Sequence, residues 1–413
     1  MPVIKAFDGY LVNPERAHDV VSPAYDAVSP EQRRLFADAH PDNFINTMRL
    51  REDFPANQRP SHEQLLEGNK QRLQQLLSNG SFDTLTESSM FVYRLGTGDH
   101  IQTGVVCEVA VEAYEQGLLR KHENTRSSRE DLLAQYQEVV GASSSPICLT
   151  YTQNDAIDDF VNSVTKGKPA LDFQTEDGET QTIWCITEKH LQAQLQFLFE
   201  QINETYLTDG HHRAASGRRY AEIMRERNES NTGDEPYNQL LVALFPDNQL
   251  NLLPFHRCVE DLNGLPLDQL LQMLEKDFKV VLLESKTPFS PACHGEFGMY
   301  VADTWYQLNL KQDRVDPSDP IDSLDVSILQ NLILDPILGI SDARKDPRLG
   351  YVAGVGGSAA IEQTYSEGWD VIFTCFATSI KQLMGVADAE QLMPPKSTYF
   401  DPKPRSGIFV RLK

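Results

Sequence analysis

The chain has 413 residues, which is long enough for two or three domains with cores of their own. It carries 60 acidic against 37 basic side chains, and the net charge of −23 repels the phosphates of nucleic acids and anionic lipids, so we expect neither as a partner. The 6 cysteines stand singly, without a CxxC pair, and this excludes a zinc knuckle or a disulfide framework. We therefore expect a cytoplasmic protein.

The first part of the chain, residues 1–88, is predicted to be a helical and loop region. A Ser-Pro pair begins a capped helix over residues 29–40, with proline at its first position. A second helix begins at a capping box formed by Ser61 and Gln64. Its leucines recur at helical spacing, and Gly80 ends it.

A β-hairpin is predicted next. Residues 91–95 and 102–109 are rich in valine and aromatic side chains, and a Gly-Thr-Gly-Asp turn separates them. A basic stretch, residues 120–126, then precedes a helix that Ser127 or Ser128 could cap. A further β-run and two helices follow, at residues 147–150, 155–165 and 188–202.

The most informative stretch is the run Asp-Gly-His-His-Arg at residues 209–213. It lies between a β-run, residues 204–207, and a helical pattern, residues 214–224, so it is predicted to open a helix. A helix N-terminus offers unpaired N–H groups and the positive end of the helix dipole to an anion. Arg213 adds a planar fork suited to two phosphate oxygens. The sequence therefore predicts a phosphate-handling turn here.

After this turn, a second hairpin is expected from residues 239–245 and 250–253. The rest alternates between helical patterns and β-runs, namely helices at 265–278, 323–338 and 358–368, and β-runs at 279–284, 298–310, 370–378 and 408–410. The pattern favours an α+β fold with mixed sheets. We divide it into an N-terminal helical region (1–88), a central core (89–262) and a C-terminal α+β domain (263–413).

Six ordered motifs make the chain resemble the uncharacterised bacterial and archaeal family called domain of unknown function 1015. The motifs are Ser22-Pro23-Ala24-Tyr25-Asp26, Lys121-His122-Glu123-Asn124-Thr125, Asp209-Gly210-His211-His212-Arg213, Leu253-Pro254-Phe255-His256-Arg257, Leu324-Asp325-Val326 with residues 333–340, and the run 393–400 from Met393 to Phe400. The family name implies no activity. Tyr25 and Asp26 lie in a loop beside a proline, where they could cover a pocket.

A His-Glu pair followed later by Asp-Gly-His-His-Arg also resembles free serine kinases of the ParB/sulfiredoxin-like superfamily. The resemblance implies a ParB/sulfiredoxin-like portion in the central core and assigns the roles by motif. Glu123 would activate the substrate hydroxyl, with His122 beside it, while Asp209 would contribute to catalysis and bind Mg²⁺ carried in with ATP or ADP. The phosphate or nucleotide contacts would be Gly210, His211, His212, Arg213, Lys121, Thr125 and Lys396.

Phosphoryl transfer needs placement and charge neutralisation, which an arginine, a helix N-terminus and imidazoles can supply. The leading hypothesis is a phosphotransferase acting between a nucleotide and a small hydroxylated metabolite such as serine. One alternative is a metal-dependent phosphohydrolase, with His122, His211, His212 and Asp209 as ligands of a transition metal. Another is a non-catalytic, nucleotide-binding switch of the ParB type.

Structural interpretations of the same residues stay open. Asp209 could be a helix N-cap, and Gly210 could serve a turn with positive φ. The stretch from Lys121 to Glu123 could be an exposed charged loop. Lys396 belongs to a scattered basic group with Lys403 and Arg405 near the end of the chain, and its loop could simply be solvated.

Overall fold

The computed structural model describes residues 3–23, 25 and 29–413, and the chain forms two compact units. Unit 1 comprises residues 1–250 together with 402–413, and unit 2 comprises residues 251–401. The proposed N-terminal region thus shares a unit with most of the proposed central core, and the proposed boundary after residue 262 falls inside unit 2. Within the described part of the chain, none of the helices combines the length and apolarity that a membrane span requires.

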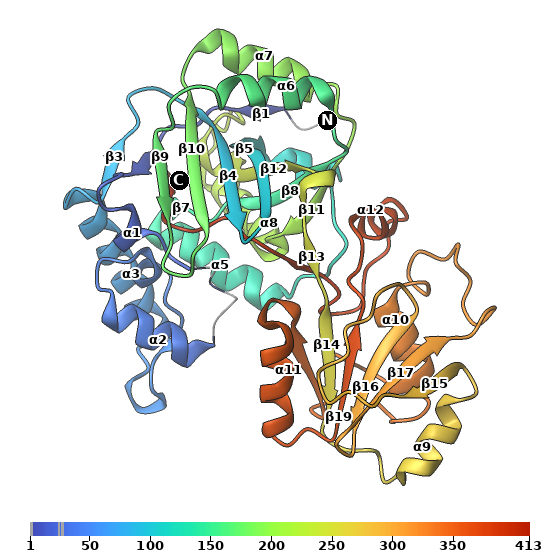
Figure 1. The fold of residues 1–413 in the computed structure, drawn as a ribbon. Coiled ribbons are helices and arrows are strands. Elements are labelled where there is room, and N and C mark those ends of the chain that lie inside the picture. Colours follow the sequence, from blue (N-terminus) through green and yellow to red (C-terminus); the bar gives the residue numbers. More distant parts are fainter. Residues whose placement is uncertain (1–2, 24, 26–28) are drawn as a thin grey trace. The chain divides into compact units, whose positions relative to one another are not determined.

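A mixed sheet forms the centre of unit 1 (Figure 1). In the described residues it has 9 strands, in the order β6 (Leu119–Arg120), β11 (Thr205–Asp209), β8 (Ile147–Tyr151), β12 (Gln239–Pro246), β5 (His100–Ala110), β4 (Met90–Thr97), β10 (Thr180–Ile186) and β9 (Leu171–Gln174), with β1 (Ile4–Lys5) paired to β5. Strand β12 runs antiparallel to β5 and parallel to β8. The predicted mixed-sheet α+β class is confirmed, and so is the hairpin, which is β4 with β5.

Both faces of this sheet are covered, because alternate side chains of its central strands enter two different cores. Val242 of β12 packs into one core with the helices α6 (Asp155–Val164), α7 (Lys189–Phe199) and α8 (His211–Arg227). Ala243 packs into the other core with α3 (His62–Ser78) and a small sheet. That sheet has the order β3 (Phe82–Thr84), β2 (Tyr10–Val12), β21 (Phe409–Leu412) and β7 (Ala142–Ser143).

Capping explains where several helices of unit 1 begin. Complete capping boxes start α2 (Pro30–Ala39) at Ser29 and α3 at Ser61, which confirms both predicted helix starts. The helix predicted after the basic stretch is present as α5 (Ser127–Val140), but the predicted serine cap was wrong, because Arg126 is its N-cap residue and no side chain caps it. Two shorter helices complete unit 1, α1 (Ala17–Val20) and α4 (Val111–Glu115).

The second predicted hairpin was also wrong. Residues 239–245 do form β12, but this strand is inserted between β5 and β8. Residues Leu252–Leu253 form β13 of unit 2 and pair with β20 (Tyr399–Phe400), far along the chain. A local turn signal between two β-runs cannot reveal that each run has a stronger partner elsewhere.

Unit 2 contains an antiparallel sheet and several helices. Its larger sheet has the order β15 (Phe278–Leu282), β17 (Thr304–Leu310), β16 (Glu296–Val301), β19 (Val371–Cys375), β14 (Phe255–Val259) and β18 (Leu349–Ala353). The helices are α9 (Leu267–Leu274), α10 (Asp325–Leu329, extended by a π-turn over Gln330–Leu334), α11 (Gly357–Ser366) and α12 (Ile380–Asp388). The single β-run predicted at 298–310 is a hairpin, because Ala302 and Asp303 adopt positive φ angles of 48° and 58°.

Candidate functional site

Two parallel neighbouring strands of unit 1 lead into the predicted site. Strands β6 and β11 are parallel, so their carboxyl ends lie at the same edge of the sheet. Strand β6 continues through the loop 121–126 into α5, and β11 continues through Gly210 into α8. Gln137 of α5 donates a hydrogen bond of 3.0 Å to the hydroxyl of Ser216 on α8. The loop and the turn therefore come together at the kind of sheet edge where α/β proteins bind ligands.

Gly210 makes the tight turn between β11 and α8. Its φ of 92° lies in the left-handed region, and a Cβ at this position would lie 2.9 Å from Nε of Arg213. The absence of a side chain thus lets the guanidinium fold back over the turn. Gly210 is the N-cap residue and no side chain caps the helix, so the interpretation of Asp209 as an N-cap was wrong.

Asp209 is the last residue of β11 and its carboxylate is shared by two cations. Lys403 Nζ donates to Oδ1 at 3.0 Å, and Arg213 forms an ion pair with Oδ2. Burial alone would raise the pKa of Asp209, but Lys403 and Arg213 together lower it below its ordinary value. The Arg213 guanidinium also donates to the carbonyl of Pro146 at 2.7 Å, which fixes its orientation. Sequence reasoning missed Lys403 as a member of this site.

The loop 121–126 brings the predicted base to the same corner. Oε2 of Glu123 lies 3.7 Å from Nδ1 of His211, the first residue of α8. The His122 and His211 rings meet edge to face, with centroids 4.5 Å apart. The His211 side chain is only 6% exposed, whereas Glu123 is 50% exposed and so remains accessible to a solute. Two motifs far apart in the sequence thus form one cluster.

The two buried imidazoles are neutral at neutral pH. Burial, reinforced by His212, Lys121 and Arg213, lowers the pKa of His211 to about 3. Burial and His211 hold the pKa of His122 well below its ordinary value. Among the described residues, Nδ1 of His122 and Nε2 of His211 have no hydrogen-bond partner although both atoms are buried. Buried polar atoms without partners are rare, and a polar ligand would satisfy them.

Further polar groups line the surroundings of these imidazoles. Burial and the nearby Arg129 and Arg126 lower the pKa of His212, while Glu130 opposes the shift. The hydroxyl of Thr125 donates to Glu130. A β-bulge interrupts the pairing of β11 with β8 just before Asp209, as is common beside functional sites.

Two predicted residues have other contacts. Lys396 belongs to unit 2, where its ammonium lies 5.1 Å from the centroid of the Phe255 ring. The Tyr25 hydroxyl donates to Asp53 Oδ2 at 3.0 Å, and Arg33 lies over the Tyr25 ring. This tyrosine is therefore tied to the N-terminal helical region, and Asp26 lies outside the described residues.

No cluster of three or more His, Cys, Asp or Glu side chains that could hold a metal ion occurs within residues 3–23, 25 and 29–413. Lys403 and Arg213 already donate to the two oxygens of Asp209, so a metal ion there would compete with both cations. The donor set proposed for a transition metal, His122, His211, His212 and Asp209, therefore does not fit such a site as these side chains stand.

Comparison with known proteins identifies the family. Residues 4–327 match the family described as "Protein of unknown function (DUF1015)", and the chain belongs to it. No curated protein matches the chain.

Several solved structures are similar at low identity. A free serine kinase variant in complex with AMP is 9% identical with a TM-score of 0.36, over 71% of this chain and 86% of that one. A conserved hypothetical protein from Pyrococcus furiosus is 10% identical with a TM-score of 0.35, over 74% and 95%. SbnI with a C-terminal truncation, from Staphylococcus aureus, is 13% identical with a TM-score of 0.39, over 74% and 87%.

Proposed function

We propose that this protein is a phosphotransferase that moves a phosphoryl group between a nucleotide, ATP or ADP, and a small hydroxylated metabolite. The observation that carries the proposal is the approach of the Glu123 carboxylate to within 3.7 Å of His211 at the N-terminus of α8. An accessible carboxylate faces a buried, hydrogen-bonding corner, as transfer from a phosphate to an alcohol requires. Serine is the first acceptor to test, because the two motifs resemble those of free serine kinases.

The α8 corner would bind the transferring phosphoryl group. The first N–H groups of α8 and the positive end of its dipole favour an anion. Arg213, held in place by Asp209 and the Pro146 carbonyl, supplies a fixed positive charge. A neutral imidazole carries one N–H, and the buried Nε2 of His211, which has no partner among the described residues, would donate it to a phosphate oxygen. These groups match the charge neutralisation that phosphoryl transfer needs.

Glu123 would accept the proton of the attacking hydroxyl. Its side chain is 50% exposed, so a small alcohol can reach it from solvent. A positioned general base contributes about 10²- to 10⁴-fold to a rate.

Mg²⁺ would enter with the nucleotide, bound mainly by its phosphates, as magnesium usually is. At Asp209 such an ion would compete with Lys403 and Arg213. The proposal therefore gives Asp209 the role of orienting these two cations. It assigns no step of the reaction to the metal.

The test is phosphate transfer followed by ³¹P NMR. The protein is mixed with ATP or ADP, Mg²⁺ and a panel of small alcohols that begins with serine, and we expect a new phosphomonoester resonance. Glu123→Gln should lower turnover by about 10²- to 10⁴-fold and leave the dissociation constant of the nucleotide unchanged. Glu200→Gln, at an exposed position next to α7, is the matched control and should turn over normally.

Turnover of the Glu123→Gln variant at the wild-type rate would remove Glu123 from the base role. Hydrolysis of the nucleotide without any phosphorylated alcohol would favour the phosphohydrolase. Nucleotide binding without any turnover would favour the non-catalytic switch.

A further inference from the structure

Two of the six sequence motifs, residues 253–257 and 393–400, meet around one arginine of unit 2. Arg257 lies in β14, and its guanidinium donates to the carbonyl of Phe255 at 2.5 Å and to the carbonyl of Pro395 at 3.2 Å. The guanidinium therefore joins the strand to the loop. Neither motif has a role in the phosphotransferase proposed above.

Arg257 is a buried cation that has no ion-pair partner among the described residues. The residue is 3% exposed, and both side-chain hydrogen bonds that it makes in this part of the chain go to backbone carbonyls, which carry no net charge. Burial lowers the pKa of Arg257, and the two groups that oppose this shift, Cys375 and Tyr351, are uncharged at neutral pH because burial raises the pKa of each. A buried charge is normally paired, since an uncompensated one is costly.

The neighbouring ionisable groups do not offset this charge. Asp325 acts on the Cys375 thiol, but its Oδ1 pairs with Nδ1 of His294 at 2.5 Å, and this contact raises the pKa of the imidazole. His256 precedes Arg257 on β14, and its Nδ1 accepts from the N–H of Cys375 at 3.1 Å. Burial and Arg257 lower the pKa of His256 to about 4, so its imidazole is neutral at neutral pH. The guanidinium thus keeps its positive charge without a carboxylate beside it.

A second cation belongs to the same contact between strand and loop. Lys396 follows Pro395, whose carbonyl Arg257 binds, and its ammonium lies 5.1 Å from the centroid of the Phe255 ring. Lys396 is exposed and forms no ion pair within the described residues. Its φ of 55° lies in the left-handed region, which residues other than glycine adopt rarely and mostly where function requires it. The loop therefore presents an exposed ammonium close to a buried guanidinium.

We propose that Arg257 and Lys396 form a binding site for a phosphate monoester in unit 2. Arginine offers a planar fork of N–H donors to phosphate oxygens, and lysine adds a point charge on a flexible stem. A phosphate monoester carries a charge of about −1.5 to −2 at neutral pH, which matches two cations, whereas a carboxylate matches one.

The guanidinium still has a donor to offer such a ligand. Nε of Arg257 has no hydrogen-bond partner among the described residues, and it is not one of the buried atoms in that condition, so solvent can reach it. The inference goes beyond the proposed function and does not rest on it, because it requires binding and no transfer reaction.

Protection of Lys396 from acetylation tests the inference on the wild-type protein. The protein is acetylated slowly with methyl phosphate, with acetate at the same ionic strength, or with neither, and mass spectrometry follows the modification of each lysine. Methyl phosphate should slow the acetylation of Lys396 severalfold, and acetate should not. Lys381, an exposed lysine of α12, should react at the same rate in all three samples.

Two results of this measurement would overturn the inference. If Lys396 reacted at the same rate with and without methyl phosphate, the site would not exist. If acetate protected Lys396 as well as methyl phosphate does, the ligand would not be a phosphate monoester.

Arg257→Lys tests the buried half of the site with the same measurement. This variant keeps the positive charge but loses the fork, so half-maximal protection of Lys396 should need at least about tenfold more methyl phosphate. Arg314→Lys is the matched control, because Arg314 also donates to a backbone carbonyl, that of Lys276 at 2.6 Å, but has a carboxylate partner, Asp277, at 3.1 Å. It should behave like the wild type. Protection of Lys396 in Arg257→Lys at the wild-type concentration of methyl phosphate would contradict the role given to Arg257.

Discussion

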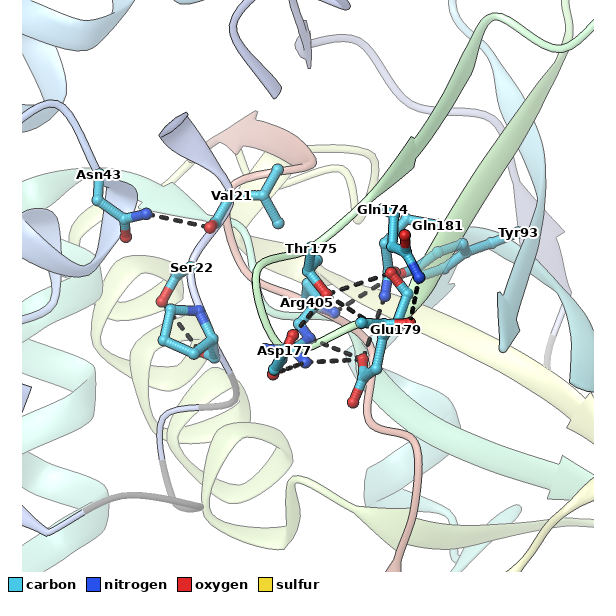
Figure 2. A network of polar contacts seen from close by, with 12 residues as sticks. Val21, Ser22, Asn43, Tyr93, Gln174, Thr175, Asp177, Glu179, Gln181 and Arg405 are labelled. Carbon is cyan, nitrogen blue, oxygen red and sulfur yellow. Dashed lines mark hydrogen bonds and ion pairs between the residues drawn. The ribbon is translucent and has the colours of Figure 1, made fainter. Parts of the chain in front are cut away.

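The segment 402–407, called the strap, connects two charged clusters of unit 1, one around Arg405 and one around Lys403 and Asp209. Around Arg405, one guanidinium meets two carboxylates, and the neighbouring Tyr93 and Gln181 are hydrogen-bonded to each other and to the strap or Glu179 (Figure 2). Around Asp209, one carboxylate accepts from two cations, Lys403 and Arg213.

The imidazoles beside the second cluster differ from the groups around Arg405 in their hydrogen bonding. Buried nitrogens of His122, His211 and His212 have no hydrogen-bond partner among the described residues. In the same part of the chain, no buried atom of Arg405, Asp177 or Glu179 lacks a partner. A closed network suits a structural role, since every group is already satisfied. A partly buried corner whose imidazole nitrogens have no partner among the described residues suits a ligand. Burial and charge alone would not have distinguished the two clusters.

The largest effect on stability is expected in the network of Arg405 with Asp177 and Glu179. Arg405→Met should lower the free energy of unfolding by about 3–5 kcal/mol, because it leaves Glu179, which is 13% exposed, without its guanidinium. Urea unfolding measures the change. Arg59→Met, at an exposed arginine without a carboxylate partner in the described structure, is the control and should change stability by less than about 0.5 kcal/mol. If Arg405→Met lowered the free energy of unfolding by less than about 1 kcal/mol, the structural role given to this network would be contradicted.

At the corner formed by the loop 121–126 and the start of α8, the expected effect is on the pH dependence of the free energy of unfolding. The pKa of His211 is lowered to about 3, while the unfolded chain keeps an ordinary value of about 6.5. The unfolded state therefore binds the proton more tightly, so this contribution to stability is complete above about pH 6.5 and is lost as the pH falls toward 3.

His211→Gln should remove this contribution. The slope of unfolding free energy against pH should fall by up to about 1.4 kcal/mol per pH unit between about pH 4 and 6, as urea unfolding at several pH values would show. His190→Gln, at an exposed histidine, should leave the slope unchanged. An identical slope for wild type and His211→Gln would mean that the imidazole is not held neutral in the folded protein.

The smallest effect on stability is expected from alanine at two glycines, and it separates backbone strain from the contact with Arg213. Gly210 and Gly141 both have positive φ, 92° and 74°, and alanine at either position should cost about 1–2 kcal/mol. A Cβ at Gly141 would meet nothing within 4 Å, whereas one at Gly210 would lie 2.9 Å from Arg213 Nε. Gly210→Ala should therefore cost more stability than Gly141→Ala, and only Gly210→Ala should weaken pyrophosphate binding. Equal effects on binding would show that Arg213 is not held by this turn.

Local signals in the sequence predicted local features well. The capping boxes at Ser29 and Ser61 begin their helices, and the positive φ of Gly210 follows from its place between a β-run and a helix. The structure also brings Glu123 to His211, as the two motifs suggested, because β6 and β11 run parallel and end at one edge. The catalytic roles of these residues stay a prediction.

Features that depend on distant pairing were not predictable in this way. Lys403 reaches Asp209 only because the strap returns to unit 1 after the whole of unit 2. The hairpin expected from 239–245 and 250–253 failed for the same reason, since each run has a remote partner. No spacing or periodicity near these residues carries that information.

The central claim is that the corner formed by the loop 121–126 and the start of α8 binds phosphate. It can be tested most directly through the imidazole resonances of the 10 histidines in ¹H–¹⁵N NMR, assigned by single substitutions. Addition of ADP or pyrophosphate should shift the resonances of His122, His211 and His212 and leave exposed His190 unchanged. Unchanged resonances at all three, at ligand concentrations that other methods show to saturate the protein, would contradict the account.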